Sequence, residues 1–421
     1  MKLFKIGAEI ADSVELKCLL ISKGVKVDHS VYKRFAKDYR LSPNPYMCNS
    51  LKLSDGTIVQ LTDLSFHLKQ LFRMFSWNNL KLMKYESDLR TPFTLSLLDD
   101  KAALFYEKDF VDFVSFQKKT DFYKQKTSSG LPFLGNAVLQ GCDFVSFQCL
   151  WPCEYAAKGK PCEYCFSGAE FELLAKKAKP QPQAVGSSDV VDIVRYAVEN
   201  RDANSIQITG GSTFSGETEY KHIYGYMKAL AESGIKLSGE ILLYITPPKN
   251  NDYIDEYFAL GANRIACSIE VWDKARAKII TPGKMHFTSR ERHLKSLEYI
   301  AEKYGAGKAF SNFIIGLESF ETLKEGAAYL AERGIIPSAS VWIPMGKPVM
   351  GSMKAPDLDY FKKVKMMLAE LYTKYKLIPA GGCGLNVCIE KDIYSYANFK
   401  KQIPEGKKIQ AFNLQGTFNN S

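Results

Sequence analysis

From Asn136 onward, short apolar runs alternate with longer segments of helical periodicity, and this alternation constrains the fold more than any other feature of the chain. Such alternation is typical of parallel strands joined by crossover helices. The predicted strands cover residues 143–148, 205–209, 240–246, 264–270, 310–318 and 337–344. Six β/α units in about 210 residues are too few for a closed eight-fold barrel of roughly 250 residues, so we expect an α/β fold built as a partial (β/α)6 barrel of TIM type.

Segments with helical periodicity separate the predicted strands. They cover residues 188–200, 220–234, 251–261, 290–305 and 319–334, several of them with a polar start or a glycine stop. A stretch rich in Pro, Gly and Ser over 176–188 predicts a linker before the first of these helices. The barrel pattern therefore begins with a strand, a long loop and a linker.

The chain divides into three predicted parts. These are an accessory α+β region over 1–135, the partial barrel over 136–350 and a C-terminal extension over 351–421. The accessory region contains strand-like runs at 57–66 and 101–116, and the extension contains a helical pattern over 358–375.

Composition excludes several classes of protein. The 421 residues are 46% hydrophobic, but no run of 18 apolar residues occurs and the N-terminus lacks the apolar core of a secretion signal, so we expect a cytoplasmic protein with no membrane contact. The net charge of +10 comes from Lys and Arg dispersed among 46 acidic residues. Because no dense basic tract occurs, we interpret the charge as a solvated surface and do not expect nucleic acid as a partner.

Three of the ten cysteines lie close together in the pattern C-x8-C-x-x-C, as Cys153, Cys162 and Cys165. They follow the first predicted barrel strand, at the face where functional loops of α/β barrels collect. Three thiolates suit either a zinc ion with a fourth ligand elsewhere or a 4Fe–4S cluster with one open iron. Cys142 and Cys149 compete with Cys153 for the first position, although both also fit a buried core.

The cysteine loop and four strand ends resemble the motifs of the radical S-adenosylmethionine (SAM) superfamily. The residues that carry this resemblance are C-E-Y-C at 162–165, I-T-G-G-S-T at 208–213, S-I-E-V-W-D at 268–273, I-I-G-L-E at 314–318 and W-I-P-M-G-K-P at 342–348. In the family these elements hold the cluster and then contact the methionine and adenine parts of SAM. The ordered recurrence of five weak motifs is more specific than any single one, and it spans about residues 136 to 350 of the chain.

The resemblance implies a cofactor pair and a reaction. Cys153, Cys162 and Cys165 would bind a 4Fe–4S cluster whose open iron takes the amine and carboxylate of SAM. An electron from a donor such as a flavodoxin or ferredoxin would then cleave SAM to methionine and a 5′-deoxyadenosyl radical that abstracts hydrogen from the substrate. The residues expected at SAM are Tyr164, Thr209, Gly210, Gly211, Ser212, Glu270, Arg292 or Arg290, Gly316 and Glu318.

The sequence departs from the family pattern at two points. Eight residues separate the first two cysteines, where the family usually has three, and Ser212 stands where relatives carry the acid of Gly-Gly-Glu. A hydroxyl accepts from an ammonium group more weakly than a carboxylate does. We therefore expect Glu270 to be the main anionic partner of the SAM ammonium, with Arg292 or Arg290 on the carboxylate.

Two other functions compete with this interpretation. The first is an interaction protein in which the cysteine loop is a structural zinc knuckle, but that function leaves the strand-end motifs without a purpose. The second is a nucleic-acid-modifying radical SAM enzyme similar to the catalytic subunit of Elongator, which also has widened cysteine spacing.

No D-x-H-x-x-G stretch is present, so we do not expect a cobalamin-dependent methylase. Cys383 and Cys388 have two possible roles. They are either redox thiols or auxiliary ligands that reach the barrel mouth, or they are buried core residues.

Overall fold

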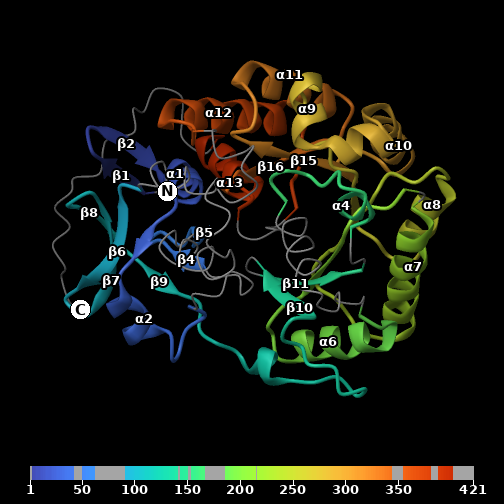
Figure 1. Cartoon of the computed structure of the whole chain (residues 1–421), viewed down its shortest axis with the longest axis horizontal. Helices are drawn as coiled ribbons and strands as arrows, with labels where there is room; N and C mark the ends of the chain where they lie inside the picture. The colour runs from blue at the N-terminus through green and yellow to red at the C-terminus, as the bar shows by residue number, and fades with distance from the viewer. Residues whose placement is uncertain are drawn as a thin grey trace.

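A seven-stranded, curved sheet forms the centre of the protein (Figure 1). The computed structural model describes residues 2–41, 50–61, 91–140, 143–149, 153–165, 185–214, 216–343, 354–380 and 387–401. In spatial order the strands are β10 (Ala137–Gln140), β11 (Phe144–Gln148), β12 (Ser205–Thr209), β13 (Ile241–Tyr244), β14 (Arg264–Ala266), β15 (Ala309–Ile315) and β16 (Ile336–Val341). β10 pairs antiparallel with β11, and every later pair is parallel.

Helices connect the parallel strands and cover the outer side of the curved sheet (Figure 1). They are α6 (Ser187–Glu199), α7 (Glu217–Glu232), α8 (Asp252–Ala259), α9 (Lys274–Ile280), α10 (Arg290–Tyr304) and α11 (Phe320–Glu332). Each of the five long helical patterns in the sequence corresponds to one of them, because an amphipathic stripe is buried against the strands. The predicted partial α/β barrel is confirmed. No helix in the described part of the chain is both long and apolar enough to span a membrane.

The sheet has one strand that was not predicted, and several predicted strands end earlier than expected: β13 at Tyr244, β14 at Ala266, β15 at Ile315 and β16 at Val341. β10 is an antiparallel edge strand that the sequence did not indicate, since its four residues are too short to show a period. β14 ends at Ala266, where the prediction extended to residue 270. The backbone leaves the ladder there, and Glu270 has a φ of +70°, a conformation that few residues other than glycine adopt. Only an isolated bridge between Glu270 and Phe313 continues the pairing.

The first 135 residues contain strands and helices around the barrel. Their elements are β1 (Leu3–Ile6), β2 (Glu9–Asp12), α1 (Ser13–Lys23), β3 (Lys26–Val27), α2 (His29–Phe35), β4 (Ser50–Lys52), β5 (Ile58–Gln60), β6 (Phe93–Leu98), β7 (Lys101–Tyr106), β8 (Asp109–Phe113), β9 (Ser115–Phe116) and a 3-10 helix, Asp121–Lys124. They form sheets of two, four and three strands. The run 101–116 forms strands as predicted. The predicted α+β region had no helix assigned to particular residues, because α1 is buried on nearly every residue and shows no polar stripe.

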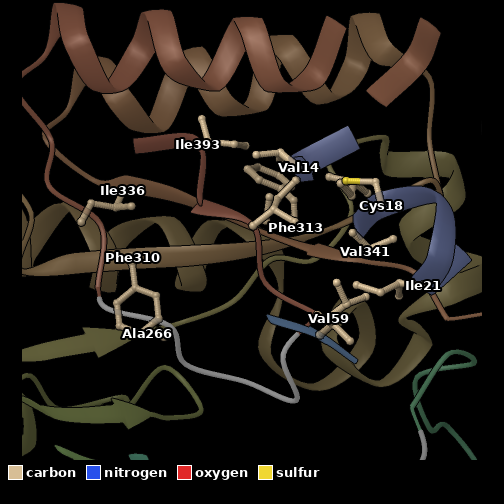
Figure 2. Close-up of a cluster of buried hydrophobic side chains, with 14 of the residues drawn as sticks. Val14, Cys18, Ile21, Val59, Ala266, Phe310, Phe313, Ile336, Val341 and Ile393 are labelled. Carbon is tan, nitrogen blue, oxygen red and sulfur yellow. The ribbon is translucent and has the colours of Figure 1, made fainter. Parts of the chain in front are cut away.

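One hydrophobic core connects the N-terminal region, the barrel and the C-terminal helices α12 (Leu358–Lys374) and α13 (Glu390–Lys401). Figure 2 shows Val14 and Cys18 of α1 beside Phe313 of β15 and Val341 of β16. Ile393 of α13 belongs to the same cluster. The predicted outer parts of the chain therefore share a core with the barrel.

A buried ion triad joins the start of α1 to α12. Asp12 caps α1 and accepts from the backbone N–H groups of Val14 and Glu15, while the carboxylate of Glu15 accepts from the N–H of Asp12. The ammonium of Lys365 in α12 donates to both carboxylates, and all three side chains are buried. Two buried carboxylates need a nearby cation, because an uncompensated buried charge is strongly destabilising.

We predict that Lys365→Met lowers the free energy of unfolding by roughly 3 to 5 kcal/mol, since it leaves two buried carboxylates without their cation. Urea denaturation followed by fluorescence measures this change. Lys363→Met in the same helix is the matched control. Lys363 pairs with Asp359 on the exposed surface, where solvent screens the charges, so its loss should leave the free energy of unfolding nearly unchanged. Equal effects of the two substitutions would contradict the role of the triad.

Candidate functional site

The cysteine loop and the glycine-containing turn start side by side at one edge of the sheet. β11 and β12 pair in parallel up to Gln148 and Thr209, and the N–H of Cys149 donates to the carbonyl of Thr209 over 2.7 Å. Carboxyl ends of parallel strands meet at the same edge, where the ligand sites of such folds lie. The loop over 153–165 and the turn over 210–214 therefore share the mouth of the partial barrel.

Gly211 packs directly on Cys153. A Cβ atom at position 211 would lie 2.7 Å from Cβ and 2.8 Å from N of Cys153, which is closer than real Cβ contacts come. The N–H of Ser212 donates to the Cys153 sulfur over 3.3 Å, and the N–H of Glu154 donates to the Ser212 carbonyl over 2.9 Å. Glycine at 211 is thus required for the turn to reach the first cysteine of the loop.

The short helix α4 (Glu154–Ala157) holds the turn from the other side. The carboxylate of Glu154 accepts from the N–H of Phe214 over 2.7 Å, and the hydroxyl of Tyr155 donates to the carbonyl of Thr213 over 3.1 Å. Tyr155 is fully buried and packs on Gly283, where a Cβ would lie 2.7 Å from that of the tyrosine. The first cysteine is therefore anchored by contacts with two separate segments of the barrel.

The second half of the loop rests on the C-terminal end of α9. The N–H of Glu163 donates to the carbonyl of Ile280 over 2.8 Å, and the N–H of Cys165 donates to the carbonyl of Cys162 over 3.0 Å. Tyr164 packs against an apolar cluster of Val271, Ala277, Ile280, Ile314, Leu317 and Trp342. Burial, and then the neighbouring carboxylate of Glu270, hold the pKa of Tyr164 well above its usual value, so its hydroxyl stays protonated.

Glu270 lies at the mouth and is already part of an ion pair. Lys284, in the π-helical turn Lys284–Thr288, donates to one carboxylate oxygen over 2.9 Å and to the Ser268 carbonyl over 2.7 Å. The side-chain amide of Asn312 donates to the other carboxylate oxygen over 3.1 Å. Lys284 was not predicted as a site residue, because nothing in the sequence indicated a π-helical turn, a feature frequent at functional sites.

The two arginine candidates differ in what they contact. Arg290 donates to the carbonyl of Trp272 over 2.6 Å, and its guanidinium carbon lies 3.5 Å from the centre of the indole ring. The Nε and Nη2 atoms of Arg292 are buried and have no hydrogen-bond partner among the described residues. Buried donors normally have partners, so these two unsatisfied guanidinium nitrogens make Arg292 a candidate to bind an anionic group.

Gly316 and Glu318 shape the loops at the mouth. Gly316 has a φ of +102°, and its N–H donates to the hydroxyl of Tyr360 over 3.2 Å. Both carboxylate oxygens of Glu318 accept from backbone N–H groups, that of Trp272 at 3.0 and 3.1 Å and that of Asp273 at 2.9 Å. These bonds hold the chain that follows Glu270 and leave Glu318 as a buried support of that loop.

The other cysteines separate into core and mouth residues. Cys18, Cys149 and Cys267 are buried in the main hydrophobic core, and burial raises the pKa of each thiol. Cys48, Cys142 and Cys383 lie outside the described residues, as do residues 344–348 of the sixth-strand motif and most of the predicted linker. Within the described residues, no three His, Cys, Asp or Glu side chains are close enough to hold one metal ion. A 4Fe–4S cluster places each thiolate on a different iron.

Cys388 lies beside the last barrel strand. The N–H of Val341 donates to the Val387 carbonyl and that of Ile389 to the Ala339 carbonyl, each over 3.0 Å, so this segment pairs with β16. The Cys388 sulfur is 3.2 Å from the Ser340 hydroxyl, which donates to Asn312 over 2.9 Å. The C-terminal extension thus returns to the barrel and reaches the neighbours of Glu270.

Glu219 lies at the mouth and was not predicted from the sequence. It is 3% exposed, and its carboxylate accepts from the N–H of Thr246 over 2.9 Å. The Thr246 hydroxyl in turn accepts from the N–H of Thr213 over 3.2 Å, so Glu219 supports the turn after β12. Burial raises the pKa of Glu219 to about 8. An acidic residue in the first turn of a helix normally indicates a solvated N-terminus, so no signal marked it as buried.

We predict that Gly211→Ala displaces the cysteine loop, because the added methyl group collides with the backbone of Cys153. Iron and sulfide content after anaerobic reconstitution should fall well below the wild-type level. Gly225→Ala is the matched control. Gly225 is inside α7, where alanine favours the helix and its Cβ meets only the movable Ser187 hydroxyl at 3.0 Å. Full iron content in Gly211→Ala would show that the turn and the loop are not coupled.

Known proteins are similar to this chain at low identity. No protein-family model matches it. A curated protein, bacteriochlorophyllide c C-7(1)-hydroxylase of Chlorobaculum limnaeum, is 24% identical over 264 residues, and the match covers 60% of this chain and 65% of the hydroxylase, just under two thirds of its length. A solved structure, a radical SAM methyltransferase from Sphaerobacter thermophilus, matches with a TM-score of 0.41 and 15% identity over 71% of this chain and 80% of that chain.

Proposed function

We propose that this chain, which belongs to the radical SAM superfamily of enzymes, holds a 4Fe–4S cluster on its cysteine loop and binds SAM at the adjoining strand ends. The packing of Gly211 on Cys153 carries the proposal. This contact joins a loop of thiols to a glycine-containing turn at the carboxyl edge of a parallel sheet. A loop that served only as a zinc knuckle would not need that turn.

The donor set fits such a cluster. Cys153, Cys162 and Cys165 are partly exposed on one loop, whereas Cys149 is fully buried in the core. A metal ligand must be deprotonated and within reach, and burial in apolar surroundings opposes both requirements. We therefore keep Cys153 as the first ligand in the proposal.

The mouth also offers groups for both ends of the amino acid part of SAM. Arg292 has two buried guanidinium nitrogens without a partner among the described residues, which suits a carboxylate. Thr209, Gly210, Gly211 and Ser212 lie at the end of β12, where glycines allow close approach to the backbone. Glu270 remains the proposed acceptor for the ammonium, although Lys284 and Asn312 already occupy part of its carboxylate.

When bound, the cluster and SAM supply the chemistry, in which one-electron reduction cleaves the sulfonium and the resulting radical abstracts hydrogen from a substrate. The chain positions the two cofactors and excludes water from the site. Val271, Ile314 and Trp342 form an apolar wall with Tyr164 at the mouth, and such a wall excludes water from reactive species. Gly316 and Glu318 remain proposed contacts of SAM, and their bonds to Tyr360, Trp272 and Asp273 hold the adjoining loops. Arg290 holds the same region through its bond to the Trp272 carbonyl.

The reaction on the substrate is proposed as a modification at a carbon–hydrogen bond. The curated relative is named as a hydroxylase of a bacteriochlorophyllide, and hydroxylation at carbon replaces a hydrogen. The proposal requires a one-electron donor such as a flavodoxin or ferredoxin, and a reducing compartment such as the cytoplasm that keeps the loop thiols available.

We predict that the anaerobically reconstituted protein releases 5′-deoxyadenosine when dithionite and SAM are added. Liquid chromatography with mass detection measures the nucleoside. Cys162→Ala combined with Cys165→Ala removes two thiols, so iron content and 5′-deoxyadenosine should both be lost. Cys18→Ala, in the core, is the control for the removal of a thiol and should retain both. A double variant with wild-type iron content would place the cluster elsewhere.

Arg292→Met should weaken SAM binding at least tenfold, because a charge-assisted hydrogen bond contributes roughly 1.5 to 3 kcal/mol. Equilibrium dialysis of SAM against the reconstituted protein gives the dissociation constant. Arg290→Met is the matched comparison, and it should bind SAM with nearly wild-type affinity since Arg290 contacts Trp272. The reverse ranking would assign the carboxylate to Arg290.

A further inference from the structure

Lys284 is a buried cation whose position the cysteine loop helps to determine. Its side chain is 12% exposed and bonds to Glu270 and to the carbonyl of Ser268. Burying an ammonium group is costly unless it is paired, so its presence at the mouth needs a reason. The pair with Glu270 compensates the charge, but it does not explain why a charge is placed here.

The backbone around Lys284 is held against the cysteine loop. Gly283, its neighbour in sequence, packs so closely on Tyr155 that a Cβ would lie 2.7 Å from that of the tyrosine. Ile280, four residues before Lys284, accepts from the N–H of Glu163 over 2.8 Å. The lysine and the cysteines at 162 and 165 are therefore parts of one packed unit.

The charge of Lys284 acts on the two thiols of this unit. The ammonium of Lys284 interacts electrostatically with the thiols of both Cys162 and Cys165. It donates to the carboxylate of Glu270 over 2.9 Å, and this ion pair keeps the ammonium charged in its largely buried position. Charges in such a buried setting are screened little by salt.

We propose that Lys284 is a positioning residue that raises the reduction potential of the cluster held by Cys162 and Cys165, with Glu270 as its counter-charge. The inference rests on the proposed function. Reduction adds one electron to the cluster, and a fixed positive charge nearby stabilises the reduced form, while a fixed negative charge destabilises it. Glu270 thus acts on the cluster through Lys284 as well as on SAM.

Removing the two charges singly should move the midpoint potential in opposite directions. Lys284→Met should shift it to a more negative value, and Glu270→Gln should shift it to a more positive value. Potentiometric titration of the reconstituted protein without SAM, followed by the EPR signal of the reduced cluster, measures both. The double variant should return toward the wild-type value. Lys278→Met, on the exposed side of α9, is the charge control and should leave the potential unchanged.

Iron content separates failure of the inference from failure of the proposed function. Wild-type protein that holds no cluster would overturn both. Variants that keep wild-type iron but show the wild-type potential, or that shift in the same direction, would overturn only the role of Lys284. If Lys284→Met loses its iron, Lys284→Arg, which preserves the charge, should keep the wild-type potential, and Glu270→Gln still tests the sign.

Discussion

The close approach of Gly211 to Cys153 is the contact on which the mouth of the barrel depends. It places the turn after β12 against the first cysteine, and Glu154 and Tyr155 then close around that turn with hydrogen bonds to Phe214 and Thr213. A side chain at position 211 would separate the two segments, because neither the loop backbone nor the strand end can move without breaking these bonds. The chemistry proposed for the site requires both segments at one place.

Two buried ion groups, far apart in the fold, have different consequences. The triad of Asp12, Glu15 and Lys365 joins the first helix to α12 and thereby makes the N-terminal region part of the barrel core. The pair of Glu270 and Lys284 lies at the mouth beside the cysteine loop. Both carry a desolvation cost that pairing offsets. The triad connects the N-terminal region to α12, whereas the pair of Glu270 and Lys284 places charge next to the proposed cluster site.

Much of the architecture could be predicted from periodicity, because strands buried on both faces and helices with one apolar stripe leave clear patterns. The predicted strands and helices differ from the observed ones where the sequence shows no periodic pattern or where the strand ends before its apolar run does. β14 ends four residues before the predicted boundary, with only an isolated bridge at Glu270 beyond it, and the short edge strand β10 has no period to detect. Helix α1 was not predicted, because it is buried on nearly every residue and its sequence shows no polar stripe.

The sequence alone determined the order of the strand ends, the three thiols of the loop and the glycines that permit close packing, since each depends on residue type and spacing. Only the tertiary structure decided which arginine retains unused donors, that Cys149 belongs to the core, and that Glu219 and Lys284 are buried at the mouth. The hydrogen-bond partners and the burial of a residue depend on segments that are distant in sequence. Glu270, which follows β14, meets Lys284 after α9, and Glu219 of α7 meets Thr246 after β13. Spacing along a chain does not encode the distance between such segments.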